Sequence, residues 1–398
     1  MRASLGLRAR AGAVLAAGAL LLAACASPGG SNPPDWKPKP SFSGEGYGPP
    51  ANQQPVQPRT PTQRPGTSNP RTRSGDPAVV AKRLTAPTGI AILPDNTALV
   101  GERTTGRIVR VQPQPGKPVP TVRTIPGIAT SGDGGLLDLA ISPHYPQDKL
   151  IFAYITTPKD NRVVAFTLTG PITPVLIGIP RGTTGNTGRL AFAADGNLLV
   201  GTGDAGRPAL AKDPRSVAGK ILRVSDIGAA APDNPARGSR VYAAGFERTD
   251  GLCAATDALL YFQTEYRPQT AADPVFHVVA GATYGSAPTA RQPVEVMPAT
   301  SRAPGGCAVL KNVLFTTTLD GKALLSAPIR ERSGSVTLGA FSPTLRNRYG
   351  RLHTVVAAPD GALWISTSNK DGKGKPVAAD ERVLRIVPSG GGGGNNPL

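Results

Sequence analysis

Histidine is scarce in this chain, whose 398 residues contain only His144, His277 and His353. No two of them have the spacing of zinc ligands, so the sequence predicts no transition-metal site. No Ser-His-Asp or Cys-His pattern stands at a recognisable spacing either, so no nucleophile with its base is identified. We expect His144 and His277 to be structural. His353 is the one histidine that we weigh as either structural or in contact with a ligand.

Long apolar runs are absent except for one, which extends from Ala11 to Ala24. Its 14 residues fall short of the ~20 that a membrane-spanning helix needs, and three arginines precede it, as in a signal peptide. The run ends in Leu22-Ala23-Ala24-Cys25, which resembles a bacterial lipobox. We therefore predict a signal peptide over residues 1–24 and a lipidated Cys25. The protein would be held by this anchor on the extracytoplasmic face of the plasma membrane, because two acyl chains suffice for stable binding. An ordinary secretory signal with a chance cysteine is the alternative.

Acidic residues are few, at 26 against 44 lysines and arginines, which gives a formal charge of +18. The signal segment and residues 26–77 contribute +3 each, so about +12 belongs to the remainder. Either this charge serves solubility, or it attracts anionic cell-wall polymers or lipid headgroups. Nucleic acid is not expected as a partner, because the basic residues are scattered and the chain is exported. Residues 25–77 contain 13 prolines and few aliphatic residues, which predicts a disordered, extended tether.

Long amphipathic helical patterns are also missing. Instead, residues 78–390 contain six loosely repeated units, each with an opening glycine, a short apolar run, a turn and a β-rich strand. The glycines lie 44 to 63 residues apart, a period that suits four-stranded propeller blades, and they are Gly89, Gly135, Gly188, Gly251, Gly306 and Gly350. We predict an all-β, six-bladed β-propeller, followed by a disordered tail over 391–398. The segments GRIVRV, GKILRV and ERVLRIV alternate apolar with basic residues, which predicts half-exposed outer strands.

Cysteine is limited to Cys25, Cys253 and Cys307. If Cys25 carries lipid, the other two remain as a pair in an oxidising compartment, which favours a disulfide over two separate buried thiols. Both follow the opening glycines of consecutive units, and adjacent inner strands would bring them within bonding range.

Several motifs resemble the soluble quinoprotein glucose/sorbosone dehydrogenases, namely GDGGLLDLAISPHYPQDKLIFAYIT, GNTGRLAFAADGNLLVGTGDAG, GKILRV and GRLHTVVAAPDGALWISTSNKDG. The resemblance covers nearly all of residues 84–388. It implies a six-bladed propeller that uses pyrroloquinoline quinone (PQQ) and calcium to oxidise aldoses. Within the family, the lipobox, the tether and the cysteine contexts are most similar to a mycobacterial lipoprotein.

The family's catalytic motifs are only partly present. Where the family has a His-Asn-Gly-Gly-Arg-Leu motif with a histidine base, this chain has Gly185 at the base position. Glycine has no side chain that accepts a proton, and a general base contributes ~10²–10⁴-fold to a reaction. An arginine that faces the quinone corresponds to Glu247, with Arg248 next to it. The calcium loop reads Glu265-Tyr266-Arg267-Pro268. Main-chain carbonyls can bind calcium whatever the side chain, so the ion is not excluded, but a cationic Arg267 is unfavourable for it.

The Asp-Glu-x-Asn motif begins here with Asp273 and is otherwise replaced, and the Gly-Arg-x-Arg motif keeps its first arginine only. We therefore assign no catalytic base and no metal ligand. The predicted ligand site at the channel mouth consists of Asp133, Asn186, Asp204, Arg248, Arg351 and His353. Asp204 is expected either to point into the mouth or to cap the following turn.

The intact repeats beside altered motifs predict a non-catalytic protein that binds a small molecule or an envelope partner at the mouth. The alternative is a PQQ- and calcium-dependent aldose dehydrogenase with Asp204 or His353 as its base. A calcium-dependent lactonase is a third hypothesis, based on fold analogy alone. No cofactor is expected unless the family chemistry is retained.

Overall fold

The computed structural model describes residues 75–255, 261–268, 272–285, 289–333 and 335–388. The predicted signal peptide, Cys25, nearly all of the predicted tether and the predicted tail over 391–398 lie outside these residues. In the part that is described, no helix is both long and apolar enough to cross a membrane.

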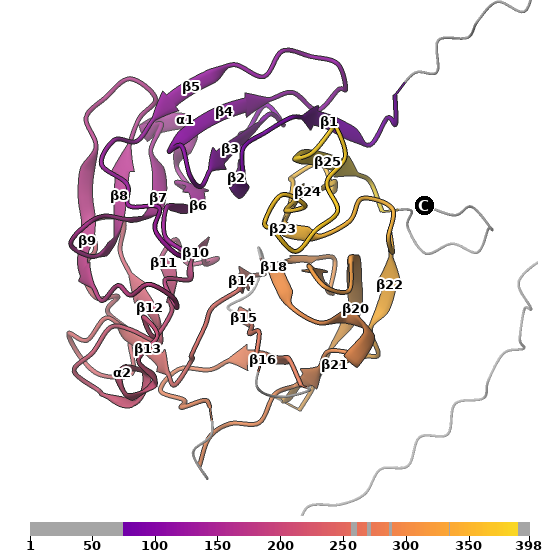
Figure 1. Ribbon diagram of the computed structural model, residues 1–398. Helices are drawn as coiled ribbons and strands as arrows, with labels where there is room; N and C mark the ends of the chain where they lie inside the picture. Colours follow the sequence, from indigo (N-terminus) through magenta and orange to yellow (C-terminus); the bar gives the residue numbers. More distant parts are fainter. Residues whose placement is uncertain (1–74, 256–260, 269–271, 286–288, 334, 389–398) are drawn as a thin grey trace, which may run out of the picture. The chain divides into compact units, whose positions relative to one another are not determined.

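Six antiparallel sheets follow one another around a ring (Figure 1). The first three sheets contain β2 (Pro87–Ile92), β3 (Ala98–Glu102), β4 (Arg107–Val111) and β5 (Thr121–Thr124), then β6 (Leu136–Ile141), β7 (Ile151–Thr156), β8 (Asn161–Phe166) and β9 (Thr173–Ile179), then β10 (Gly188–Phe192), β11 (Leu198–Thr202), β12 (Lys220–Val224) and β13 (Val241–Ala244). The next two contain β14 (Gly251–Ala254), β15 (Tyr261–Thr264), β16 (Pro274–Val278) and β17 (Glu295–Val296), then β18 (Pro304–Leu310), β19 (Val313–Thr318), β20 (Ala323–Arg332), β21 (Ser335–Leu338) and β22 (Ser342–Thr344). The last contains β23 (Leu352–Ala357), β24 (Leu363–Thr367), β25 (Arg382–Ile386) and β1 (Val79–Lys82), and the short helices are α1 (Tyr145–Asp148), α2 (Pro208–Lys212) and η1 (Ala299–Ser301).

The ring closes through β1, which pairs with β25 and supplies the outermost strand of the last sheet. The innermost strands of consecutive sheets contact one another, and β23 also contacts β2. Each opening glycine lies in an innermost strand or one or two residues before it. The predicted all-β, six-bladed propeller is confirmed.

The innermost strands approach one another so closely that side chains are excluded at some positions. A Cβ added to Gly89 of β2 would lie only 2.6 Å from the backbone nitrogen of Leu139 and 2.8 Å from the carbonyl carbon of Asp138, both in β6. Glycine is therefore required where β2 crosses β6, because any larger residue would separate the two inner strands.

The apolar core lies between neighbouring sheets. One cluster joins Val100 of β3 to Trp364 of β24, and another joins Val163 of β8 to Leu222 of β12; all four side chains are fully buried. Burial of each such side chain contributes about 1.5–3 kcal/mol, so the contact between sheets stabilises the ring.

The alternating basic segments are the third strands of their sheets and are more buried than the half-exposed outer strands that we predicted, since every residue of β12 is buried. Arg110 of β4 pairs with Asp95, and Arg223 of β12 pairs with Asp195, in each case an aspartate from the turn between the first two strands. Arg385 of β25 repeats the arrangement with Asp360. In each turn the aspartate also accepts a hydrogen bond from the backbone two residues later. The arginines recur because they bind these turns from the neighbouring strand.

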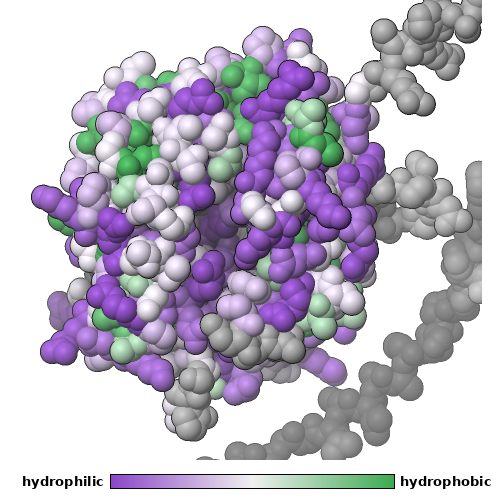
Figure 2. Space-filling model, viewed as in Figure 1, coloured by the Kyte–Doolittle hydropathy of each residue, from purple (hydrophilic) through white to green (hydrophobic). Residues whose placement is uncertain are grey.

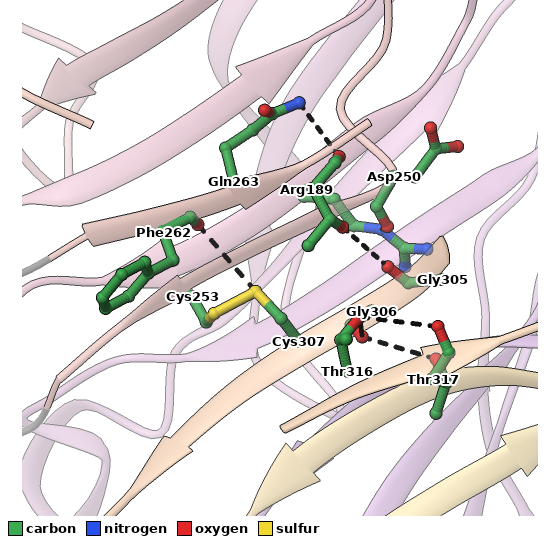
Figure 3. The surroundings of a disulfide bond; sticks show 11 residues. Arg189, Asp250, Cys253, Phe262, Gln263, Gly305, Gly306, Cys307, Thr316 and Thr317 are labelled. Atoms are coloured by element: carbon green, nitrogen blue, oxygen red, sulfur yellow. Dashed lines mark hydrogen bonds between the residues drawn. A yellow bond between two sulfur atoms is a disulfide. The ribbon is translucent and has the colours of Figure 1, made fainter. Parts of the chain in front are cut away.

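The predicted disulfide between Cys253 and Cys307 is confirmed (Figure 3). It connects the innermost strands β14 and β18, with 5.6 Å between the two Cα atoms. Both cysteines are buried, and Cys253 packs beside Phe262 in the apolar cluster of the fourth and fifth sheets. The bond therefore links two sheets at the centre of the ring.

Replacing both cysteines by alanine is expected to lower the free energy of unfolding by about 2–4 kcal/mol, because the bond closes a long loop in the unfolded chain. The two cysteines are 54 residues apart in the sequence, and this separation determines the length of the closed loop. Guanidinium unfolding of the oxidised wild type and the double variant measures the difference. An unchanged midpoint would contradict a stabilising role.

Candidate functional site

A polar cavity of about 230 Å³ lies where the innermost strands and their loops meet. Three of the six predicted site residues line it, namely Asp133, Arg248 and His353. Hydrophilic side chains surround a hollow near the middle of the face in Figure 2. A second cavity of about 320 Å³ shares Arg103 and His353 with the first and extends toward the loop that follows β24. A larger groove of about 700 Å³ lies beside β1, away from the motif residues.

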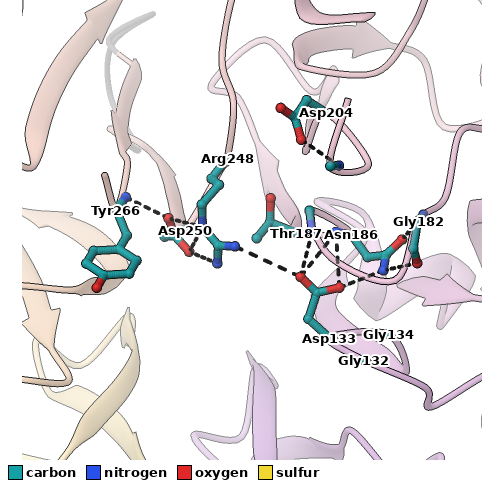
Figure 4. Close-up of polar contacts among 12 residues, drawn as sticks. Gly132, Asp133, Gly134, Gly182, Asn186, Thr187, Asp204, Arg248, Asp250 and Tyr266 are labelled. Carbon is teal, nitrogen blue, oxygen red and sulfur yellow. Dashed lines mark hydrogen bonds and ion pairs between the residues drawn. The ribbon is translucent and has the colours of Figure 1, made fainter. Parts of the chain in front are cut away.

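Asp133 joins two loops at this mouth (Figure 4). Its carboxylate accepts hydrogen bonds from the backbone nitrogens of Gly185 and Asn186, at 2.8 and 3.2 Å, and from the Asn186 side chain at 2.6 Å. Asn186 is fully buried, and its amide also contacts Gly182 and Asn161. Asn186 therefore positions the loop, and its side chain has no exposed group for a ligand.

The backbone at the family's base position excludes a side chain. Gly185 has φ +71°, in the left-handed region that favours glycine. A Cβ there would lie 2.7 Å from Oδ1 of Asp204 and 3.1 Å from the backbone nitrogen of Ala205. The loop is therefore built around the absence of a side chain at position 185.

Asp204 caps a turn. Its Oδ1 accepts a hydrogen bond of 2.8 Å from the backbone nitrogen of Gly206, and its side chain does not line the central cavity. Burial raises the pKa of this carboxyl, and the nearby Glu247 raises it further. Of the two alternatives for Asp204, the structure shows the turn cap.

Arg248 reaches the mouth but is neutralised by aspartates. Its guanidinium donates to both carboxylate oxygens of Asp250, with the shortest contact at 2.7 Å, and lies 3.9 Å from Asp133 (Figure 4). The attraction to Asp250 raises the pKa of Arg248. This arginine therefore stays charged, with its charge balanced inside the protein.

Arg351 does not join the central group. It is buried, and its guanidinium binds Asp320 at 2.5 Å and Asp371 at 2.7 Å. Because two carboxylates surround it and it does not line the central cavity, Arg351 acts as a link between the loops after β19 and β24. Arg351 therefore does not line the central cavity, although its charge lies close enough to lower the pKa of His353.

His353 of β23 faces both cavities. Its Nδ1 lies 2.9 Å from Oγ1 of Thr354, whose hydroxyl donates to the carbonyl of Thr88. Nδ1 therefore carries the proton and Nε2 keeps its lone pair. Burial, reinforced by Arg189, Arg103 and Arg351, holds the pKa of His353 well below its usual value of 6.5. The ring is neutral because it is buried and because its surroundings are positive.

Two arginines of the mouth were missed by sequence reasoning. Arg189 of β10 donates to the carbonyl of Asp250 at 2.7 Å, and Arg103 donates to the carbonyl of Gly134 at 2.8 Å. Among the described residues, neither has a carboxylate within 4.0 Å. A charged residue directly after the opening glycine of an innermost strand was the available signal for Arg189.

The family model described as Glucose / Sorbosone dehydrogenase matches residues 84–378. The chain belongs to this family. It is similar to the PQQ-bound aldose sugar dehydrogenase of Streptomyces coelicolor, with 33% identity, a TM-score of 0.72 and coverage of 78% of this chain and 96% of that chain. It is also 29% identical to quinoprotein glucose dehydrogenase B of Acinetobacter calcoaceticus over 53% of this chain, and 28% identical to aldose sugar dehydrogenase YliI of Escherichia coli over 39% of it. Those two alignments span about half of each curated relative, at 52% and 46%.

The cations of this glucose/sorbosone dehydrogenase propeller do not form a clamp for PQQ, which carries three carboxylates. Arg248 and Arg351 are bound to aspartates, and Glu247 stands where the family has an arginine. In the described part of the chain, Arg103 and Arg189 form no ion pair within 4.0 Å, but Arg103 interacts at longer range with Asp133 and Arg189 with the buried Asp138. The residues present do not fit the family's way of holding the cofactor.

The loop that corresponds to the family's calcium site is also occupied by protein groups. Arg302 donates to the carbonyl of Arg267 at 2.8 Å and to the carboxylate of Asp273 at 2.9 and 3.1 Å. Arg267 in turn binds the buried Glu265 at 2.9 Å. In the described part of the chain, no three acidic, histidine or cysteine side chains converge as metal ligands. This loop does not fit calcium.

Proposed function

We propose that this member of the family is a non-catalytic, ligand-binding propeller, anchored through Cys25 outside the plasma membrane. The observation that carries the proposal is the loop at Gly185, whose backbone conformation and neighbours leave no room for the family's base. The neutralised Arg248 and Arg351 support it, because a tricarboxylate would have to displace their aspartates.

The chemistry of the cavity favours an anionic ligand. Arg103 and Arg189 bring two positive charges, and within the described residues their hydrogen bonds go to carbonyl and hydroxyl oxygens. Asp133 and Asp250 also line the cavity, so its three arginines and two aspartates leave one net positive charge. A phosphate or carboxylate group between Arg103 and Arg189 would form charge-assisted hydrogen bonds, with the neutral His353 available to take up a proton. The ligand class is thus a small anion or the anionic group of an envelope polymer.

The protonation of His353 tests this proposal. With only three histidines in the chain, imidazole NMR signals are assignable by single substitution of His144 and His277. We expect inorganic phosphate or citrate to raise the pKa of His353 toward 6.5, because a bound anion stabilises the imidazolium. Without a bound anion, the His353 ring should stay neutral as the pH falls below 6.5, because its pKa lies well below that value. A bound anion should therefore move the protonation of His353 to higher pH. If neither anion moves the His353 signals, the proposed ligand class is wrong.

Anchoring is tested separately. In a bacterium that processes lipoproteins, we expect the full chain in the membrane fraction and a Cys25→Ala variant in the soluble fraction outside the cell membrane. Loss of the acyl chains removes ~0.8 kcal/mol per buried CH2 group, so the shift should be nearly complete. Retention of the variant in the membrane fraction would contradict the anchor.

A second candidate is a PQQ- and calcium-dependent aldose dehydrogenase with an altered site. The similarity to a PQQ-bound aldose sugar dehydrogenase over 96% of that chain favours it. His353 is the better candidate base of the two considered, because it is neutral and lines the cavity, whereas Asp204 caps a turn. PQQ-dependent oxidation of a sugar, lost in His353→Gln, would support this candidate over the first.

A further inference from the structure

Arg302 lies at a position where oxygen atoms from two segments converge. It follows η1, 35 residues after Arg267 in the sequence, and its guanidinium reaches back to the Glu265–Pro268 loop. Nη2 bridges the carbonyl of Arg267, at 2.8 Å, and Oδ1 of Asp273, at 3.1 Å, while Nε binds Oδ2 of Asp273 at 2.9 Å. A carbonyl and a carboxylate around one cation are the kinds of oxygen that calcium takes as ligands.

The charges of this region are balanced without a metal. Glu265 and Asp273 are both fully buried, and among the described residues Glu265 pairs with Arg267 and Asp273 with Arg302, at 2.9 Å in both cases. Asp273 also accepts hydrogen bonds from the backbone nitrogens of Arg267 and Ala303, at 3.0 and 2.9 Å. A divalent cation added here would meet two arginines instead of an excess of carboxylates, and the repulsion from one guanidinium in contact weakens binding by about 100-fold or more.

We propose that Arg302 is a built-in cation that replaces calcium at this loop. Its guanidinium supplies the positive charge that holds the Arg267 carbonyl and the Asp273 carboxylate together. The fold at this corner of the ring is therefore independent of divalent metal, and the oxygen atoms that a metal would use are kept in place by a side chain. Removal of that side chain should expose the oxygens to metal.

Terbium luminescence tests the proposal, because the ring of Tyr266 lies 5.8 Å from the guanidinium carbon of Arg302 and would sensitise a lanthanide bound there. With the full chain, we expect no saturable terbium emission from the wild type and the same unfolding temperature in calcium as in a chelator. Arg302→Ala should give emission that saturates with terbium. The apparent affinity of the variant for terbium should be at least about 100-fold higher than that of the wild type. Calcium should displace the bound terbium.

Two further variants keep the outcome interpretable. Arg348→Ala removes one arginine from another Arg–Asp pair that also lies beside a tyrosine. It should show no emission, because Asp76 is only half-buried there and no backbone carbonyl is bound by Arg348 beside it. Arg302→Ala/Asp273→Asn should lose the emission that Arg302→Ala gains. If Arg302→Ala is unstable, Arg302→Gln removes the charge with less loss of packing and should also gain emission. Saturable terbium or calcium binding by the wild type, or folded Arg302 variants without emission, would overturn the proposal.

Discussion

Restoring the family's histidine at position 185 will not restore an enzyme; we expect Gly185→His to lower the free energy of unfolding by about 2–5 kcal/mol. The left-handed backbone costs a non-glycine residue about 1–2 kcal/mol, and crowding against Asp204 and Ala205 adds about 1–3 kcal/mol. The φ of +71° and the 2.7 Å approach to Asp204 Oδ1 are the physical causes. Denaturant unfolding of the purified variant gives the value.

Gly196 provides the matched control. It has the same left-handed conformation, with φ +81°, but nothing lies within 4 Å of the position that a Cβ would take. Gly196→His should therefore show only the backbone cost of about 1–2 kcal/mol. If the two variants were equally stable, the loop at Gly185 would have room for a side chain. The main support for a lost base would then disappear.

Removal of Arg189 should abolish anion binding and change the titration of His353. Arg189 is one of the positive groups that lower the pKa of His353, so Arg189→Met should raise that pKa even without anion. Phosphate or citrate should then cause little further change, because one of the two arginines proposed to hold the anion is gone. Histidine NMR of the variant across pH 5–8 measures both effects.

Arg215→Met is the control for charge alone, since that arginine is 90% exposed and remote from the mouth motifs. It should leave the response of His353 to phosphate as in the wild type. A phosphate response in Arg189→Met equal to that of the wild type would place the anion elsewhere. Arg189 also stabilises the charged form of the buried Asp138, so a folded-state spectrum must accompany the titration.

The fold was predictable because its signals are local and repeated. Glycine at positions such as Gly89 is required wherever inner strands touch, and turn aspartates such as Asp95 recur between the first two strands. The disulfide followed from the equivalent positions of Cys253 and Cys307 in consecutive units.

The site was less predictable because its properties depend on partners distant in sequence. Arg351 was expected to contact a ligand at the mouth, yet its guanidinium is bound by Asp320 and Asp371 and does not line the central cavity. Arg302, which follows η1 in the sequence, binds the Glu265–Pro268 loop, and no sequence motif identifies it. Arg103 and Arg189 stand out because neither forms an ion pair within 4.0 Å among the described residues, and a sequence does not show such distances. Charge balance in a site of this kind follows only from the three-dimensional arrangement.

The most direct test of the central claim is a calorimetric titration of PQQ into the full chain in the presence of calcium, followed by a panel of aldoses with an electron acceptor. The account predicts no saturable binding in the micromolar range and no PQQ-dependent oxidation. Saturable binding at micromolar concentrations or tighter, together with oxidation of an aldose, would contradict it and identify the protein as a working quinoprotein.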